Sequence, residues 1–204
     1  MERTLVPVTD VAADLRYALQ GLPGVPAQPW LESETAERLS RAQQWLAPQG
    51  YQLLIWDPWR SRVTQQAISD RYHDELVRSG MDSDTAREAV REFVASPAGV
   101  YPHGTGGVVD LTLCRDDQPQ NCGTDFDEFS PRAHREWFTT HRPETAIDLQ
   151  AAYRRLLLQQ AMEHAGFVGL PHEWWHFEFG TRMWARHTGQ EPFLTGVLEP
   201  QLRA

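Results

Sequence analysis

The stretch from Gly169 to Gly180, GLPHEWWHFEFG, gathers acids, imidazoles and aromatic rings within a dozen residues. Glu173 and His176 lie three residues apart in it, a spacing that offers one group to bind a metal ion and another to move a proton. The same segment also fits a half-buried strand with its aromatic rings inside and its acids outside. An isolated ExxH pair does not decide between these interpretations, so the functional one depends on a second cluster upstream.

The second cluster is VYPHGTGGVVDLTL, which holds His103 and Asp110 seven residues apart. Its three glycines allow the backbone to approach a site closely. In the run VVDLTL, a strand would place Asp110 on one face together with Val108 and Thr112. A carboxylate among apolar neighbours costs free energy unless it is paired or bound to a metal, which indicates a nearby cation. The alternative is an edge strand with Asp110 in solvent.

Together, the two clusters supply the ligands of a catalytic zinc site. His103, Asp110 and His176 are two imidazoles and a carboxylate, and three protein ligands with a fourth position for water are typical of catalytic zinc. Glu173, three residues before a ligand, can take a proton from that water and deliver it to a leaving amine. Arg60, on the turn after the predicted strand YQLLIW, can stabilise the oxyanion that develops on an attacked carbonyl.

The neighbours of these residues have weaker patterns. Trp174 lies beside the predicted base and is expected to line the pocket. Glu178 lies two residues after His176 on the same strand face, where it is either a hydrogen-bond partner of that histidine or an exposed acid. Cys114 and Cys122 either close a small disulfide loop or stay reduced, as a cytoplasmic protein favours, and they lack the spacing of a structural zinc site.

The composition is that of an ordinary globular protein, and 204 residues suffice for one domain with a sizeable core. The net charge of −9 argues against nucleic acid and against an anionic membrane surface as partners. No apolar run is long enough to span a bilayer, and the N-terminal MERTLVPVTDVAADL lacks the pattern of a secretory signal. Every basic residue is an arginine, which indicates a GC-rich genome, and a cytoplasmic bacterial protein is expected.

The periodicity predicts a single α+β domain over residues 1–204, a central antiparallel sheet flanked by helices. Residues 1–30, rich in proline and glycine, are expected to form an arm packed on the core. The predicted elements are a helix capped by Ser33, a strand at 51–56, a helical stretch over 64–96 with a turn at SGMDSD, a helix started by the capping box of Thr145 and Asp148, and a strand over EWWHFEF.

The order of an arginine, HxxxxxxD and EWWHF resembles the D-alanyl-D-alanine dipeptidases of the VanX type, zinc peptidases of family M15. The group also includes D,D-carboxypeptidases and shares a core with the Hedgehog signalling domain. The resemblance covers nearly the whole chain. EWWHF matches fully at residues 173–177, while DLRYA at 14–18 and GTDFDEF at 123–129 resemble two further family segments. The family motif SxHxxGxAxD is met here by Tyr101, His103, Gly106, Val108 and Asp110.

The resemblance implies the roles of the site residues. One zinc ion per chain would be held by His103, Asp110 and His176, with Glu173 as the general base and Arg60 as the arginine that stabilises the transition state. Asp127 and Tyr17 would hold the free ammonium of a small dipeptide substrate.

The chain also departs from the family pattern. Tyr101 stands where the family has a serine and Val108 where it has an alanine, so Tyr101 is expected to narrow the mouth of the site. These departures leave the reaction class intact and put the identity of the dipeptide in doubt.

Two other functions fit the same residues. One is a peptidase or amidase acting on a longer peptide, such as a D,D-carboxypeptidase, although Asp127 would block the amino end of such a substrate. The other is a binding module that keeps zinc without hydrolysis, although binding alone needs neither Glu173 nor Arg60. The sequence leaves the particular dipeptide, its biological role and the number of subunits open.

Overall fold

A computed structural model describes residues 3–201, apart from the side chains of residues 92 and 93. Its centre is a sheet with the strand order β2-β4-β5-β8-β7, in which β6 also pairs with β5. Only the β2–β4 pair is parallel among these described pairs. The strands are β2 (Ala12–Ala13), β4 (Gln52–Asp57), β5 (Val108–Arg115), β6 (Gln118–Pro119), β7 (Val168–Gly169) and β8 (His176–Glu178).

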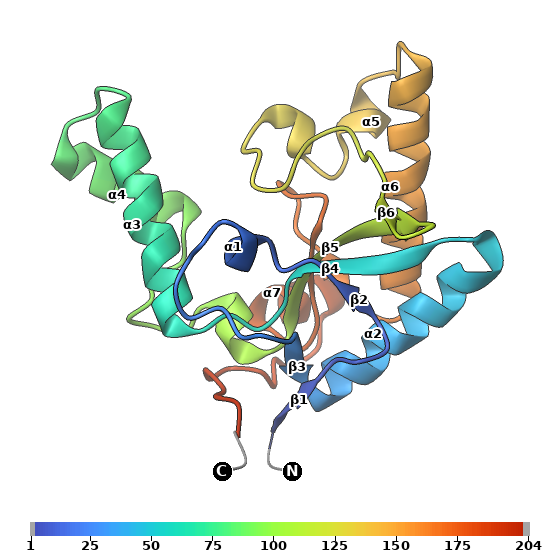
Figure 1. Ribbon diagram of the computed structural model, residues 1–204, viewed down its shortest axis with the longest axis horizontal. Coiled ribbons are helices and arrows are strands. Elements are labelled where there is room, and N and C mark those ends of the chain that lie inside the picture. Colours follow the sequence, from blue (N-terminus) through green and yellow to red (C-terminus); the bar gives the residue numbers. More distant parts are fainter. Residues whose placement is uncertain (1–2, 202–204) are drawn as a thin grey trace.

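Two helices, α2 (Ser33–Leu46) and α6 (Ala146–His164), pack against each other on one face of this sheet (Figure 1). The alternation of side chains along the strands explains the division of faces. Val109, Leu111 and Leu113 of β5 and Phe177 of β8 belong to the buried core on the helix side. The residues between them, among them Asp110 and His176, therefore point to the other face, where the site lies.

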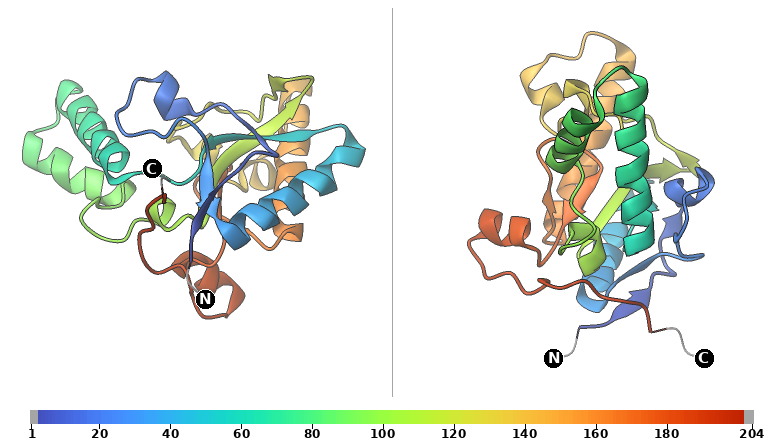
Figure 2. Two further views of the ribbon diagram at one scale, coloured as in Figure 1. Left: turned by 60° about the horizontal axis from the view of Figure 1, so that its bottom comes forward. Right: turned by 90° about the vertical axis from the view of Figure 1, so that its left-hand side faces the viewer.

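The opposite side of the molecule carries a helical hairpin of α3 (Arg62–Arg78) and α4 (Ser83–Phe93), which lies away from α6 in Figure 1 and in the left view of Figure 2. The short helix α1 (Arg16–Leu19) lies between this hairpin and the sheet (Figure 1). The remaining elements are β1 (Leu5–Pro7), β3 (Trp30–Glu32), η1 (Ala47–Gln49), η2 (Pro102–Thr105), η3 (Pro131–Ala133), α5 (Trp137–Thr140) and α7 (Arg182–Thr188).

The N-terminal segment is tied to the rest of the chain at two places. β1 and β3 form an antiparallel pair of their own, and β2 extends the central sheet by pairing with β4. No helix in the described part of the chain is long and apolar enough to cross a bilayer. The predicted α+β fold with a central antiparallel sheet flanked by helices is confirmed, except that the short β2 joins the sheet in parallel.

Two local predictions need correction. The cap of α2 is Glu32 and not Ser33, because the buried Glu32 carboxylate accepts hydrogen bonds from the backbone N–H groups of Glu34 and Thr35. The predicted strand EWWHFEF is shortened to β8, because residues 171–175 form turns before it. The capping box at Thr145 is present, since its hydroxyl accepts from the Asp148 N–H at the start of α6.

Candidate active site

The register of three neighbouring strands brings the central side chains into one row. Asp110 of β5 lies opposite His176 of β8 on one side and opposite Asp57 of β4 on the other. Strand β4 pairs regularly up to Ile55 and then shifts, so that Trp56 is an extra residue in the ladder. Such a bulge re-aims the following side chain, which explains how Asp57 reaches the site face instead of the core face.

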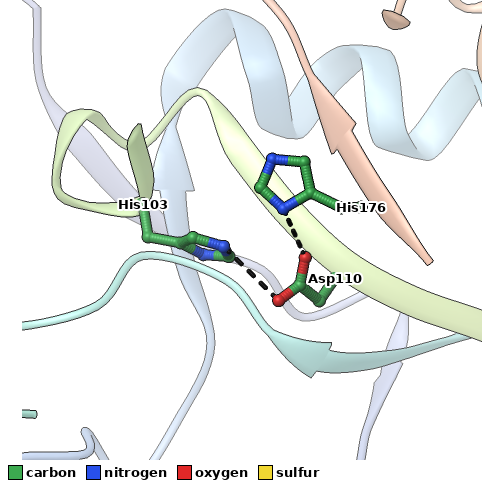
Figure 3. A group of neighbouring side chains, drawn as sticks. All are labelled: His103, Asp110 and His176. Carbon is green, nitrogen blue, oxygen red and sulfur yellow. Dashed lines mark ion pairs between the residues drawn. The ribbon is translucent and has the colours of Figure 1, made fainter. Parts of the chain in front are cut away.

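His103 comes from η2, directly before β5, and its ring is oriented by β4. Its Nδ1 lies 2.8 Å from the Pro58 carbonyl oxygen and 3.0 Å from Asp57 Oδ2. The other ring nitrogen, Nε2, lies 3.4 Å from Asp110 Oδ2 (Figure 3). Because Nδ1 can donate its proton to these oxygens, Nε2 is left with a free lone pair toward Asp110.

His176 is oriented in the same way by its own strand. Its Nε2 lies 3.0 Å from Glu178 Oε1, and its Nδ1 lies 2.9 Å from Asp110 Oδ1 (Figure 3). Glu178 is only 3% exposed and also accepts a hydrogen bond from the Thr181 hydroxyl. Burial raises the pKa of Glu178, but the hydrogen bonds from His176 and Thr181 outweigh this and lower it. Glu178 is thus a partner of the histidine and not an exposed acid.

The three residues fit a metal ion. One ligand atom from each of His103, Asp110 and His176 can be chosen so that all lie within 4.8 Å of one another. Asp110 is 3% exposed, which excludes the alternative of a solvated edge strand, and its Oδ1 is buried without a hydrogen bond although His176 Nδ1 is near. Two imidazole nitrogens and a carboxylate oxygen that converge in this way are the donor set that zinc prefers.

The charge balance around His176 supports a cation there. Burial alone would lower the pKa of His176, but Asp110 and Glu178 raise it well above its usual value. The surrounding carboxylates therefore stabilise positive charge at the point where the ligand atoms meet.

Glu173 reaches the site from the turn that precedes β8. On a regular strand, residues three apart point to opposite faces, so the turn is what brings Glu173 to the side of His176. Glu173 Oε2 lies 3.7 Å from His176 Nδ1, and the side chain is 22% exposed. Burial raises the pKa of Glu173, with His176 opposing and Asp110 adding to the effect. A raised pKa suits a carboxylate that accepts a proton and later donates it.

Arg60 is held rigidly beside the ligands. Its Nε and Nη2 lie 2.9 and 2.7 Å from Asp57 Oδ2, and its Nη1 donates to Gln65 Oε1 at 2.8 Å. Its Nη2 also lies 3.9 Å from Asp110 Oδ2. Burial alone would lower the pKa of Arg60, but Asp57, Tyr17 and Asp110 raise it above its usual value. A fixed positive charge therefore faces the site.

Tyr17 and Asp127 meet across 110 residues of sequence. The Tyr17 hydroxyl donates to Asp127 Oδ1 at 3.2 Å, and Arg71 Nη2 of α3 lies 3.7 Å from the other carboxylate oxygen. Asp127 adopts a left-handed backbone conformation with φ +60°. Burial raises the pKa of Asp127 to about 7, and the charge of Asp110 adds to the increase.

These groups share one cavity of about 190 Å³. Glu178, Gln65 and several apolar residues complete its wall. The predicted residues that line it are Tyr17, Arg60, His103, Asp110, Asp127, Glu173 and His176. The candidate metal ligands, Glu173 and the Tyr17–Asp127 pair therefore line the same cavity.

Two predicted residues do not line this cavity. Tyr101 is fully buried, and its hydroxyl donates to the Arg60 carbonyl at 2.9 Å. Its ring lies against Gly104, where a Cβ atom would come within 2.6 Å of the ring, so the side chain lies behind the wall and not at the mouth. Trp174 is also buried, and its Nε1 donates to the Thr124 hydroxyl at 2.7 Å. Neither residue is among those that line the cavity.

Sequence reasoning missed Asp57, which contacts both His103 and Arg60. Its position three residues before Arg60 in WDPWR was the available signal, since a buried arginine needs a carboxylate partner. A second groove of about 560 Å³ was also missed. It adjoins the cavity through the shared residues Phe129, Leu170 and Glu173.

Comparisons with known proteins agree with the geometry of the site. The family model described as "D-ala-D-ala dipeptidase", peptidase M15, matches residues 3–191. The D-alanyl-D-alanine dipeptidase of Synechocystis sp. is 31% identical over 76% of this chain and 71% of its own length. That of Enterococcus faecium is 29% identical over 71% of this chain and 70% of its own length.

Solved structures share the fold at low identity. VanYB in complex with D-alanine-D-alanine has a TM-score of 0.54 and 16% identity, covering 91% of this chain and 89% of its own. The LdcB LD-carboxypeptidase has a TM-score of 0.54 and 18% identity, covering 96% of this chain and 78% of its own. The family match spans most of the sequence and includes all the residues that converge in the cavity. The chain therefore belongs to peptidase family M15, the family of D-Ala-D-Ala dipeptidases.

Proposed function

We propose that the protein is a zinc-dependent dipeptidase that hydrolyses D-Ala-D-Ala or a closely related small dipeptide. The observation that carries this proposal is the shared cavity, in which the convergent triad of His103, Asp110 and His176 faces Asp127. Its volume of about 190 Å³ is below the ~300–1,000 Å³ of pockets for drug-sized ligands. A small substrate with a free amino end suits both its size and its acid.

The residues divide the reaction between them. When bound, zinc supplies a Lewis acid that polarises the scissile carbonyl and activates the attacking water. Glu173 accepts a proton from that water and donates it to the leaving amine. Arg60, held by Asp57 and Gln65, presents a fixed positive charge to the oxygen of the attacked carbonyl.

Tyr17 and Asp127 bind the amino end of the substrate. The ionised Asp127 carboxylate attracts the ammonium, and the Tyr17 hydroxyl fixes the orientation of that carboxylate by its 3.2 Å hydrogen bond. An ammonium would take over the carboxylate oxygen that now lies 3.7 Å from Arg71. This arrangement selects peptides whose scissile bond follows the first residue.

We also infer a cytoplasmic bacterial setting with a substrate from peptidoglycan metabolism. Cys114 and Cys122 are both free and buried, as in proteins of reducing compartments. The named relatives are bacterial D-alanyl-D-alanine dipeptidases, and the LdcB LD-carboxypeptidase, which shares the fold, is described by its recognition of peptidoglycan.

The adjoining groove of about 560 Å³ favours a second candidate, a peptidase for larger or longer peptides. The groove shares Phe129, Leu170 and Glu173 with the cavity but contains neither Asp127 nor Arg60. A substrate could extend into it past the base, whereas an extension at the amino end would meet Asp127.

A panel of peptides separates these candidates. Release of free amino acid is measured with the zinc-loaded enzyme on D-Ala-D-Ala, L-Ala-D-Ala, L-Ala-L-Ala, N-acetyl-D-Ala-D-Ala and D-Ala-D-Ala-D-Ala. We expect turnover of D-Ala-D-Ala and loss of activity on the acetylated peptide, which lacks the ammonium. Preference for the acetylated peptide or the tripeptide would overturn the dipeptidase proposal and leave a carboxypeptidase. Absence of any hydrolysis, with zinc bound, would leave a binding module.

A further inference from the structure

The turn that carries Asp127 has an unusual backbone. Asp127 has a φ of +60°, in the left-handed region that costs free energy for residues other than glycine. Among the hydrogen bonds of the described chain, none is made by the backbone of Phe126 or Asp127. A strained conformation persists only where its surroundings enforce it. Here the surroundings must act through side chains.

Glu128 closes the turn on the side that follows Asp127. Its Oε2 accepts a hydrogen bond from the Asp125 N–H at 3.3 Å, and its Oε1 accepts one from the Ser130 hydroxyl at 2.7 Å. The Glu128 carbonyl also accepts from the Ser130 N–H at 2.9 Å. All three bonds join residues within the turn itself, so they shape the turn without attaching it to the rest of the molecule.

Phe126, directly before Asp127, attaches the turn to the core. Its ring packs against those of Tyr17, Trp56 and Trp175, with centroid distances of 5.4, 5.4 and 5.8 Å and the tilted or edge-on geometries that aromatic pairs prefer. These partners are 3%, 6% and 1% exposed. They come from α1, β4 and the turn before β8, so three separate parts of the chain hold the ring.

One of these partners also bonds to Asp127. The Tyr17 hydroxyl donates to Asp127 Oδ1 at 3.2 Å, while the Tyr17 ring packs against Phe126. Phe126 therefore constrains Asp127 in two ways, through the peptide bond that joins them and through the tyrosine that orients the carboxylate. Phe126 itself is not among the residues that line the cavity.

We propose that Phe126 is a positioning residue for the amino end of the substrate. Its ring holds Asp127 in the left-handed conformation that presents the carboxylate to the ammonium, so this part of the site need not be ordered when the substrate binds. The inference rests on the proposed function, in which Asp127 binds the ammonium. None of the three ring partners is a metal ligand, Glu173 or Arg60, so loss of the Phe126 ring should change KM more than kcat.

Steady-state kinetics of the zinc-loaded full chain on D-Ala-D-Ala test the proposal. Phe126→Ala is expected to raise KM about tenfold while kcat changes little, because the substrate must then order the carboxylate itself. Phe126→Leu keeps apolar bulk in the same place and is expected to restore most of the affinity. Equal KM values of wild type and Phe126→Ala would overturn the proposal.

The matched control is Phe193→Ala. The Phe193 ring is also half-buried against the core, lies 5.3 and 5.6 Å from the rings of Phe179 and Trp184, and does not line the cavity. Its loss is expected to lower the free energy of unfolding, as the loss of Phe126 does, but to leave KM unchanged. An equal rise of KM in both variants would show general damage and overturn the positioning role.

A second background tests whether Phe126 acts through Asp127. In Asp127→Asn the charge that binds the ammonium is absent, so adding Phe126→Ala is expected to leave KM where Asp127→Asn alone puts it. The free energy of unfolding should still fall, because the packing of the ring is lost. If Phe126→Ala raises KM by the same factor with and without the Asp127 charge, the proposal is overturned.

Hydrogen exchange tests the same role without catalysis. The N–H groups of Asp125 and Ser130, which are bonded within the turn, are expected to exchange at least about fivefold faster in Phe126→Ala than in the wild type and in Phe193→Ala. A wild type that hydrolyses no dipeptide would refute the proposed function but leave this measurement valid. Equal exchange rates in wild type and Phe126→Ala would overturn the positioning role whatever the activity.

Discussion

Each imidazole of the candidate metal site has one ring nitrogen committed to an oxygen of the protein. The Pro58 carbonyl and the Asp57 carboxylate contact Nδ1 of His103, while the Glu178 carboxylate contacts Nε2 of His176. The two histidines therefore present different nitrogens to Asp110, and the partner of each ring decides which one. These partners set the basicity of the ligands and the rigidity of the site.

A change at Glu178 tests this role. Glu178→Gln keeps a similar shape but removes the charge that His176 faces at 3.0 Å, so we expect zinc affinity to fall about 10- to 100-fold. Competition with a chromophoric chelator measures the affinity, and Glu191→Gln, an exposed acid, serves as the control. Equal affinities of wild type and Glu178→Gln would show that the hydrogen bond does not tune the ligand.

Asp127 gives the site a pH dependence. Its pKa is raised to about 7 by burial and by the charge of Asp110, and only the ionised form attracts an ammonium. A bound cation lowers this value, so KM for a dipeptide is expected to fall as the pH rises through about 7 or slightly below. Asp127→Asn should raise KM more than it lowers kcat and remove the dependence. A wild-type KM that is constant between about pH 5.5 and 7.5 would contradict this role.

At the level of single residues, the sequence was sufficient to select His103, Asp110 and His176 as candidate ligands, and the fold brings one donor atom of each within 4.8 Å of the others. It was insufficient for Asp57, because only the bulge at Trp56 turns that side chain to the site face. The sequence also misplaced Tyr101. The replacement of a family serine by a tyrosine does not show that the larger ring packs against Gly104.

At the scale of elements, Arg155 of α6 ties together the two ends of the loop that carries Asp127. Its Nε donates to the Cys122 carbonyl at 2.6 Å, and its Nη1 donates to the carbonyls of Arg132 and His134 at 2.9 and 3.1 Å. The guanidinium also lies over the Trp174 ring, next to Glu173. One buried side chain therefore links the loop that carries Asp127 to the turn that carries Glu173.

Replacing Arg155 should loosen this loop. Arg155→Ala leaves three carbonyls without their donor and removes buried packing, so we expect the free energy of unfolding to fall by about 2–4 kcal/mol. KM for the dipeptide should rise as well. Denaturant titration and steady-state kinetics measure the two effects. The neighbouring Arg154→Ala is the matched control, because Arg154 bonds mainly to the single carbonyl of Asn121. Equal stabilities of the two variants would contradict the stabilising role of the Arg155 hydrogen bonds.

The start of β8 could not be predicted from the sequence. Alternation over EWWHFEF fits a strand, but the backbone N–H of Trp174 donates to the Ala133 carbonyl at 3.0 Å and holds a turn there. This contact joins residues about forty apart, and no local pattern contains it. The longer helices were predictable because their start signals are local, as at Thr145, although the cap of α2 proved to be Glu32.

At the scale of the whole molecule, the α+β architecture followed from the sequence because one set of alternating residues builds the core and the other builds the site. The core side chains of β5 and β8 meet α2 and α6 on one face. The site side chains face α1 and the start of α3 on the other, where Tyr17 and Gln65 line the cavity. The strand order and the register, which involve pairings over long distances, had to come from the structure.

Metal binding should stabilise the whole fold, because the buried Asp110 has an oxygen without a hydrogen bond. A ligand at about 100 times its Kd adds roughly 2.7 kcal/mol. For a chain of this size, that corresponds to a fall in Tm of roughly 5–10 °C when a chelator removes zinc. Differential scanning calorimetry with and without chelator, followed by zinc addition, measures the shift. An unchanged Tm would show that the ligand set does not hold zinc in the folded protein.

The most direct test of the dipeptidase account is the kcat of zinc-loaded Glu173→Gln on D-Ala-D-Ala beside the wild type. Glutamine cannot carry the proton, so kcat should fall about 10²- to 10⁴-fold while one zinc ion per chain stays bound. That result would identify Glu173 as the group that moves the proton. A variant that keeps its zinc and hydrolyses the dipeptide at the wild-type rate would contradict the account.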